Sequence, residues 1–302
     1  MATNNFKPFA TGAGANVLSQ ADYESLAALS SGFQAGKASS AQINKALRQG
    51  SVMASILAQF IADSSGNDVL DNGNTAAILA SLKAGLLSSA PGRLLGCRVI
   101  TSSGTYTPTP GTKSIIPEVQ GAGGGGAGAG ATSSSAIAIG SGGSAGAYAK
   151  SLITNLAASY AVVVGLGGSG GNGSANGLNG GASSFGSLIT ANGGFGGGFS
   201  NGAPPALNNA TGSATASGGN LINITGASPV IAMALSLGVC IAGGGGNSML
   251  GTGGGAHGTA GGGNPASGYG AGGGGANAYQ SNSIIYRGAD GGNGVIFVWE
   301  FS

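Results

Sequence analysis

The residues that most often carry out chemistry are few and scattered in this chain. Its one histidine, His257, lies in the run GGGAHGTAGGG, where no nucleophile or base accompanies it. The carboxylates of the C-terminal half are Glu118, Asp290 and Glu300, and they are too widely spaced in sequence to indicate a catalytic pair. We therefore predict no catalytic residues, and the enzyme class is disfavoured.

Metal and disulfide chemistry has equally little to build on. Zinc usually takes four ligands, which His257, Cys97 and Cys240 do not supply. The two cysteines would form at most one bridge, and two small buried hydrophobic residues are the favoured interpretation. Three copies of His257 on a trimer axis would be an alternative metal site, but a solvent-facing loop histidine is favoured. We predict no metal and no cofactor.

Glycine strings raise the question of nucleotide binding. GLGGSGG at 165–171 follows a predicted strand, as a dinucleotide fingerprint would. The next residues, NGSANGLNGG, do not predict a helix, and no acidic residue follows at the required distance. The glycines are better interpreted as structural spacers.

His257, Cys240, Asp290 and the glycine strings lie in one long segment, 121–294, which holds most of the 66 glycines. Between Glu118 and Arg287 the only charged residue is Lys150. Ordering a glycine costs roughly 0.5–1 kcal/mol more than ordering an alanine, so backbone packing must offset a large entropy. Extended helices of three residues per turn, similar to polyproline II, would offset it by hydrogen-bonding sideways. Disorder is disfavoured because disordered segments are typically hydrophilic and charged.

Strand patterns frame and interrupt the glycine runs. Residues 295–301, VIFVWEF, and 161–166, AVVVGL, are rich in β-branched or aromatic side chains. Residues 230–242 alternate large side chains with small ones, and the small face would let another backbone approach closely. Further strands are predicted at 97–100, 104–106, 114–120 and 147–153. Residues 199–220 read as an exposed loop.

The N-terminal part has helical patterns instead. A helix follows Ser19 and stops at Gly32, a longer one follows Ser39 or Ser40, and Asn74 caps a third. Apolar residues of the long helix share one stripe, which so small a domain cannot bury alone: Ile43, Leu47, Met53, Leu57 and Phe60. Oligomerisation is therefore expected.

Composition divides the chain and excludes several partners. The prediction is an α+β fold with a helical domain at 1–90 and a glycine-rich, β-sandwich-like domain at 91–302. A net charge of +2, from 10 basic and 8 acidic residues, is too small for nucleic-acid binding. The first residues, MATNNFKPFATG, contain no apolar run and predict no signal peptide, so synthesis in a cytoplasm is expected.

Recognition is expected from side chains in the loops, because strands and glycine helices use their amides on one another. The predicted receptor-binding residues are Phe199, Asn208, His257 and Tyr269. The alternative for the aromatic residues, Phe195 and Tyr279 among them, is that they fill gaps between glycine helices.

Two stretches resemble bacteriophage tail fibre proteins that end in a glycine-rich domain. Residues 9–61, from FATGAGANVLSQADYESL to SILAQFI, are similar to the N-terminal segment of short tail fibres. GTYTPTPGTKSIIPEVQGAGGGG, SGGSAGAYAKSLI, VVVGLGGSG, SSFGSLITANGG and GADGGNGVIFVWEF are similar to the glycine-rich domain.

The resemblance implies a homotrimer of the virion tail, attached by its N-terminus to baseplate or tail-tip proteins. Its C-terminal domain would bind a host surface receptor such as lipopolysaccharide, a pilus or an outer-membrane protein. The alternatives are a purely structural fibre or baseplate component without receptor contact, and a tail enzyme that degrades polysaccharide.

Overall fold

A computed structural model describes residues 2–33, 38–208 and 212–302. The chain forms two compact units, Met1–Pro91 and Gly92–Ser302. The first is helical and the second consists of antiparallel sheets and glycine-rich runs, so the fold is α+β, as predicted. No helix in the described ranges is long and apolar enough to cross a membrane.

Three helices of the first unit begin at predicted caps, Ser19, Ser39 and Asn74. A capping box starts the long helix: the Ser39 side chain accepts from the Gln42 amide, and the Gln42 side chain accepts from the Ser39 amide. Gly66 ends that helix in the left-handed conformation. The helices are α1 (Gln20–Glu24), α2 (Ala28–Ser31), α3 (Ser40–Ser65) and α4 (Thr75–Ser88).

The helix predicted between Ser19 and Gly32 is in fact two short helices. Ser19 caps α1 and Gly32 follows α2, so both predicted ends are confirmed. Between them the Leu26 amide bonds to the Tyr23 carbonyl, an i to i−3 step that tightens the backbone. The continuous helix was therefore a wrong prediction.

Helices α3 and α4 pack through small and β-branched side chains. The core of this unit comprises Ala58, Ile61, Ala62 and Val69, with Ile78 and Leu82 of α4 against it. The predicted stripe of α3 lies outside this core, since Leu47 is 53%, Met53 67% and Leu57 51% exposed. Among the described residues, nothing covers most of that stripe.

Two five-stranded sheets of the second unit enclose its main core. The first has the order β1-β18-β3-β5-β12 and the second β11-β8-β7-β6-β2. Strands of the first are β1 (Leu94–Ile100), β3 (Ser114–Gln120), β5 (Tyr148–Lys150), β12 (Ile222–Ile224) and β18 (Val295–Phe301). Strands of the second are β2 (Gly104–Tyr106), β6 (Tyr160–Val163), β7 (Ser183–Phe185), β8 (Ile189–Ala191) and β11 (Ala216–Ser217).

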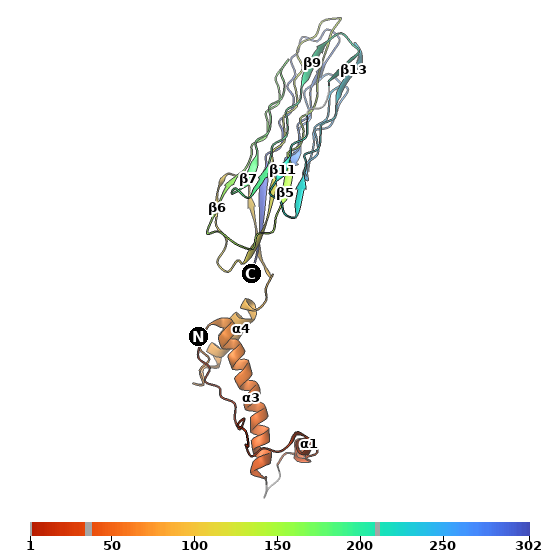
Figure 1. The fold of residues 1–302 in the computed structure, drawn as a ribbon. Helices are drawn as coiled ribbons and strands as arrows, with labels where there is room; N and C mark the ends of the chain where they lie inside the picture. The colour runs from red at the N-terminus through yellow and green to blue at the C-terminus, as the bar shows by residue number, and fades with distance from the viewer. Residues whose placement is uncertain (1, 34–37, 209–211) are drawn as a thin grey trace. The chain divides into compact units, whose positions relative to one another are not determined.

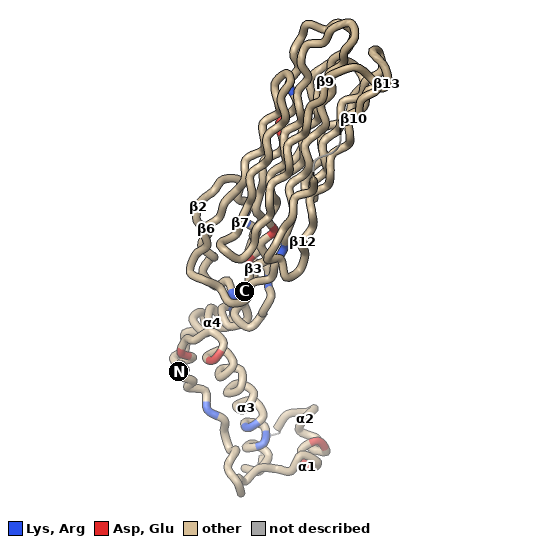
Figure 2. The backbone as a smooth tube through the Cα atoms, turned by 45° about the horizontal axis from the view of Figure 1, so that its top comes forward, with Lys and Arg blue, Asp and Glu red and all other residues tan. Residues whose placement is uncertain are grey.

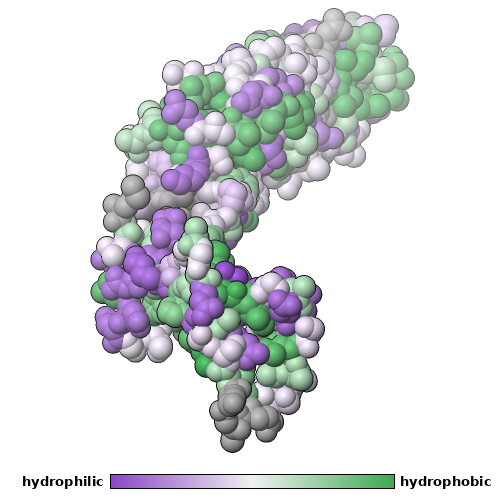
Figure 3. Space-filling view, turned by 60° about the horizontal axis from the view of Figure 1, so that its bottom comes forward, coloured by the Kyte–Doolittle hydropathy of each residue, from purple (hydrophilic) through white to green (hydrophobic). Residues whose placement is uncertain are grey.

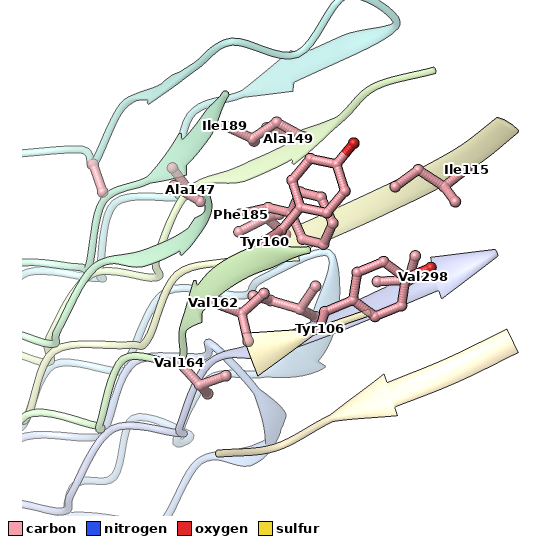
Figure 4. Packing of buried hydrophobic residues seen from close by; sticks show 14 residues of the cluster. Tyr106, Ile115, Ala147, Ala149, Tyr160, Val162, Val164, Phe185, Ile189 and Val298 are labelled. Atoms are coloured by element: carbon pink, nitrogen blue, oxygen red, sulfur yellow. The ribbon is translucent and has the colours of Figure 1, made fainter. Parts of the chain in front are cut away.

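The inner faces of these sheets form a sandwich, which confirms the predicted architecture. Ile115 and Val298 of the first sheet pack with Phe185 and Tyr160 of the second, all of them buried. The Tyr160 and Phe185 rings lie 4.7 Å apart between centroids, and Figure 4 shows them at the middle of the cluster. Aromatic and branched side chains thus hold this end of the unit.

Smaller sheets lie elsewhere in the unit. Their orders are β17-β4-β9, β10-β13-β14 and β15-β16. The strands are β4 (Ile137–Gly140), β9 (Phe199–Gly202), β10 (Ala206–Asn208), β13 (Ala232–Ser236), β14 (Val239–Ile241), β15 (Leu250–Thr252), β16 (Ser267–Tyr269) and β17 (Asn277–Ala278).

Between the sheets, the glycine runs are ordered by lateral hydrogen bonds with a period of three. In the run 121–129, the amides of Gly121, Gly124 and Ala127 donate to Ala147, Ser144 and Ser141, at 2.8, 2.9 and 3.0 Å. The partner numbers fall as the donor numbers rise, so the two segments are antiparallel. A three-residue period is that of a polyproline II helix, as the composition predicted.

The run 121–129 is surrounded on all sides by other runs. Its amides donate to three antiparallel segments, 141–147, 175–181 and 286–292, and its carbonyls accept from three parallel segments, 168–171, 194–197 and 273–276. Figure 1 shows these segments side by side along the unit, and Figure 2 shows how few charges they carry. The amide pairing that a glycine run needs is therefore met inside one chain.

The structure of residues 199–220 differs from the prediction. This segment was predicted to be an exposed loop, but it supplies β9, β10 and β11. Each of these strands pairs with a strand outside the segment, namely β4, β13 and β8. Such pairings leave no local pattern, and residues 209–211 lie outside the described ranges.

Candidate functional site

The outer surface of β10-β13-β14 is an exposed apolar face. Leu207 is 63%, Leu235 59% and Val239 49% exposed, and Met233 and Ile241 complete the face. Ala232, Ala234 and Cys240 point the other way and are buried against Ile137 and Ile139. The small residues of 230–242 thus allow close approach, as predicted, and the large ones face outward.

Figure 3 shows apolar surface gathering at the end of this unit where Figure 1 labels β13. Pro205, Leu207 and Leu235 line a groove of about 370 Å³ there. Contiguous exposed apolar surface on a soluble protein usually marks an interaction site. The alternation of large and small side chains in 230–242 predicted two distinct faces, but it did not show which of the two would be exposed.

Two of the predicted receptor residues lie beside this face. Asn208 pairs with Ala232 in the β10–β13 ladder and so faces inward, where its amide donates to the Gly198 carbonyl at 2.5 Å. Phe199 is half-buried in β9 and pairs with Gly140. The outward-facing neighbour of Asn208 is Leu207, which the sequence did not single out.

His257 is held in a backbone pair rather than in a free loop. Its carbonyl accepts from the Ala242 amide at 2.9 Å, and its Nε2 lies 3.4 Å from the Gly261 carbonyl. The side chain is half-buried, and Nδ1 has no hydrogen-bond partner among the described residues. The favoured expectation of a solvent-facing histidine was therefore wrong.

Tyr269 lies apart from the other three predicted residues. It belongs to β16 and pairs with Leu250. The run 270–276 separates it from Asn277, whose side chain contacts the His257 carbonyl at 3.4 Å. At about 3.1 Å per residue, the eight steps from Tyr269 to Asn277 span roughly 25 Å.

Tyr279 donates a hydrogen bond from its hydroxyl to the Gly258 carbonyl at 3.1 Å.

The carboxylates are each engaged by different partners. Glu118 accepts from Lys150 Nζ at 2.9 Å and from Trp299 Nε1 at 3.1 Å, on the outer face of the first sheet. Burial raises the pKa of Glu118, but hydrogen bonds from Lys150 and neighbours outweigh burial and hold that pKa below its usual value. Glu300 is buried on the inner face and accepts from Tyr106 at 2.7 Å.

The remaining acid, Asp290, pairs with Arg287 and accepts from the Gly170 amide at 2.7 Å. Glu118 and Glu300 lie on opposite faces of the first sheet, and Asp290 is paired with Arg287. These three carboxylates therefore do not form a facing pair. Among the described residues there is also no group of three or more potential metal-ligating side chains. Cys240 is buried as expected, whereas Cys97 is exposed, and both are free.

At the outer glycine runs, polar side chains spaced three residues apart accept hydrogen bonds from backbone amides. The sequence alone did not predict this role. Asn176 and Asn179 accept from the Phe199 and Gly196 amides, at 3.0 and 2.8 Å. Asp290 and Asn293 do the same for Gly170 and Gly167, at 2.7 and 2.8 Å. These side chains take the place of a neighbouring helix at the surface of the array.

The string GLGGSGG serves the same array. The Gly168 and Gly171 amides donate to the Gly123 and Gly126 carbonyls, both at 2.9 Å. The string therefore acts as a structural spacer, the interpretation that the sequence favoured.

Comparison with known proteins agrees with this architecture. Residues 101–299 match the family described as a glycine-rich domain. The match covers most of the chain, so the protein belongs to this glycine-rich domain family. No curated protein matches the sequence.

Proposed function

We propose that this protein is a bacteriophage tail fibre protein that binds a host surface receptor through its glycine-rich unit. The observation that carries the proposal is the array of glycine runs joined by lateral hydrogen bonds, which holds an exposed apolar face at one of its ends. The resemblance of residues 9–61 and of the glycine-rich pattern to tail fibres supports it. Baseplate attachment would then belong to the helical unit.

The receptor contact centres on the apolar face, with Phe199 and His257 near its rim and Tyr269 as a separate contact. Residues 151–286 contain no charged residue, so binding is expected to depend only weakly on salt. The bound group would be an apolar patch of an outer-membrane protein or pilus, or the lipid portion of lipopolysaccharide. Several copies per particle would add avidity to weak single contacts.

The helical unit is proposed to join copies of the chain into a trimer. Its support is the uncovered stripe of α3, with Leu47, Met53 and Leu57 all about half exposed or more. Apolar residues at spacings of three and four are the pattern by which helices associate. A second copy of the same stripe would bury these side chains.

The test is binding of the fluorescent full-length chain to a panel of Gram-negative bacteria. Saturable binding is expected, and Leu207→Ser with Leu235→Ser should weaken it by tenfold or more, on the order of 1.4 kcal/mol. Leu166→Ser, at a 73% exposed residue on a glycine run, is the matched control and should bind like the parent. Absence of saturable binding to every strain would favour the structural-component alternative.

A further inference from the structure

The sandwich is open along one side, between the edge strands β1 and β2. β1 ends the first sheet and β2 ends the second. A crevice of about 440 Å³ lies between them, lined by Arg98, Ser102, Ser103, Thr105, Tyr106 and Val162. Tyr106 and Val162 belong to the buried core, where Figure 4 labels them, so the crevice reaches from the surface toward that core.

Arg98 points into this crevice. In the β1–β18 ladder it stands opposite Val298, whose side chain is fully buried between the sheets. Residues directly opposite in an antiparallel ladder project to the same face. The guanidinium therefore belongs to the inner side of the sandwich, at its open edge.

The charge of Arg98 is not neutralised by an ion pair among the described residues. Lys150 and Arg287 each pair with a carboxylate, whereas Arg98 donates only to the Thr107 carbonyl, at 3.5 Å. Glu300, which is 3% exposed, lies near enough to feel the charge of Arg98, but its oxygens accept from the Tyr106 hydroxyl and the Thr109 amide and not from the guanidinium. Most of the five N–H donors of the guanidinium thus remain available.

Hydroxyl groups surround the same space. Ser103 Oγ accepts from the Val164 amide at 3.0 Å, which leaves its own hydrogen free to donate. The side chain of Ser102 forms no hydrogen bond within the described residues, whereas Thr105 pairs with the exposed Ala161 and so projects to the outer face of its sheet. The lining contains no acidic side chain. It is therefore rich in donors and carries one positive charge.

We propose that this crevice binds a small anionic group, a carboxylate or a phosphate, between Arg98 and the hydroxyls of Ser102 and Ser103. Guanidinium matches both groups in geometry because it can donate two parallel hydrogen bonds. The site goes beyond the proposed receptor contact and does not depend on it. It lies at the sandwich, on a different set of strands from the apolar face.

The competing explanation is that Arg98 only protects the β1 edge. Inward-pointing charges on edge strands prevent pairing with other chains. In that case Arg98→Gln would associate or aggregate and would bind anions as the parent does. The experiment below separates this explanation from a binding site.

The experiment is titration calorimetry of the full-length chain at low ionic strength with inorganic phosphate, glucuronate and, as a neutral probe, glucose. Saturable binding of phosphate or glucuronate, but not glucose, is expected. The separate phosphate and glucuronate titrations show which anion the crevice prefers. Arg98→Gln should weaken binding about tenfold or more, the effect of losing a charge-assisted hydrogen bond.

Two further variants make the outcome decisive. Arg93→Gln removes an exposed arginine of the same unit that does not line the crevice, and it should bind like the parent. Ser102→Ala removes one of the proposed hydroxyl donors and should weaken binding severalfold without changing the melting temperature greatly. Absence of saturable anion binding by the parent, or an equal loss in Arg93→Gln, would overturn the proposal. Either result would leave cell binding through Leu207 and Leu235 unaffected, so the two proposals fail separately.

Discussion

Gly126 and Gly274 approach so closely that a Cβ on Gly126 would overlap the Gly274 carbonyl oxygen. Both lie in the array of glycine runs, where Gly126 donates its amide to Ala289 at 2.8 Å. The neighbour is backbone and cannot rotate away, as a flexible side chain would. The spacing of the array thus depends on the missing side chains.

Gly126→Ala is therefore expected to destabilise the protein strongly, by about 3 kcal/mol or more, because overpacking a rigid site forces backbone shifts. Gly50→Ala is the matched control. Gly50 lies within α3 and a Cβ there meets nothing within 4 Å, so this change should stabilise by roughly 0.5–1 kcal/mol. Thermal unfolding followed by circular dichroism measures both. Equal melting temperatures would show that the runs are loosely packed.

The polar side chains that complete the outer runs should contribute measurably to stability. Asn179→Ala removes the acceptor for the Gly196 amide, and a loss of about 0.5–1 kcal/mol is expected because water replaces it only in part. Asn179→Asp keeps an acceptor oxygen and should retain most of the stability. Urea unfolding of the three proteins checks this. A similar loss in both variants would contradict an acceptor role.

Because of Glu118, the free energy of unfolding should decrease as the pH falls into the acid range. Its pKa is lower in the folded protein than in the unfolded chain, so its ionised form stabilises the fold above the unfolded pKa of about 4.3. That contribution is lost as pH falls through the lower, folded pKa.

Glu118→Gln cannot ionise, and it should be about 1–2 kcal/mol less stable than the parent near neutral pH. The gap should narrow below roughly pH 4, where the parent carboxylate takes up a proton. Melting temperatures from pH 7 to pH 3 measure the gap. A difference that stays constant over this range would assign the effect of the substitution to packing.

The exposed stripe of α3 should drive self-association. Leu57→Lys places a charge on the stripe and should shift the full-length chain toward monomer in analytical ultracentrifugation. Leu79→Lys, at a 51% exposed residue of α4, tests a different face and should leave the assembly intact. A parent chain that sediments as a monomer at all concentrations would refute trimerisation through this unit.

Local patterns predicted much of the fold. Ser39 and Asn74 mark helix starts because caps act within a few residues. VIFVWEF forms β18 over the predicted residues because its β-branched and aromatic side chains suit a buried strand. Pairings between distant segments had no such signal, which is why β9, β10 and β11 were missed.

Local sequence is equally unable to predict which single glycines of the runs are tightly packed. Gly273 and Gly244 stand in nearly identical strings, GAGGGGANAY and IAGGGGNSML. A Cβ on Gly273 would overlap the Ala289 carbonyl, whereas one on Gly244 would lie 3.1 Å from the Ala256 amide. Which glycine faces a backbone depends on the register of the array. Similarly, the orientation of Asn208 and Leu207 depends on their pairing with β13.

The position of β18 has a consequence for how the protein folds. This strand, Val295–Phe301, lies between β1 and β3 in the first sheet, and the adjacent run 286–292 bonds along the run 121–129. Residues separated by more than 150 positions must meet before either the sheet or the array is complete. Folding dominated by such distant contacts is slow. On the ribosome, the glycine-rich unit must therefore remain incomplete until residue 301 has emerged.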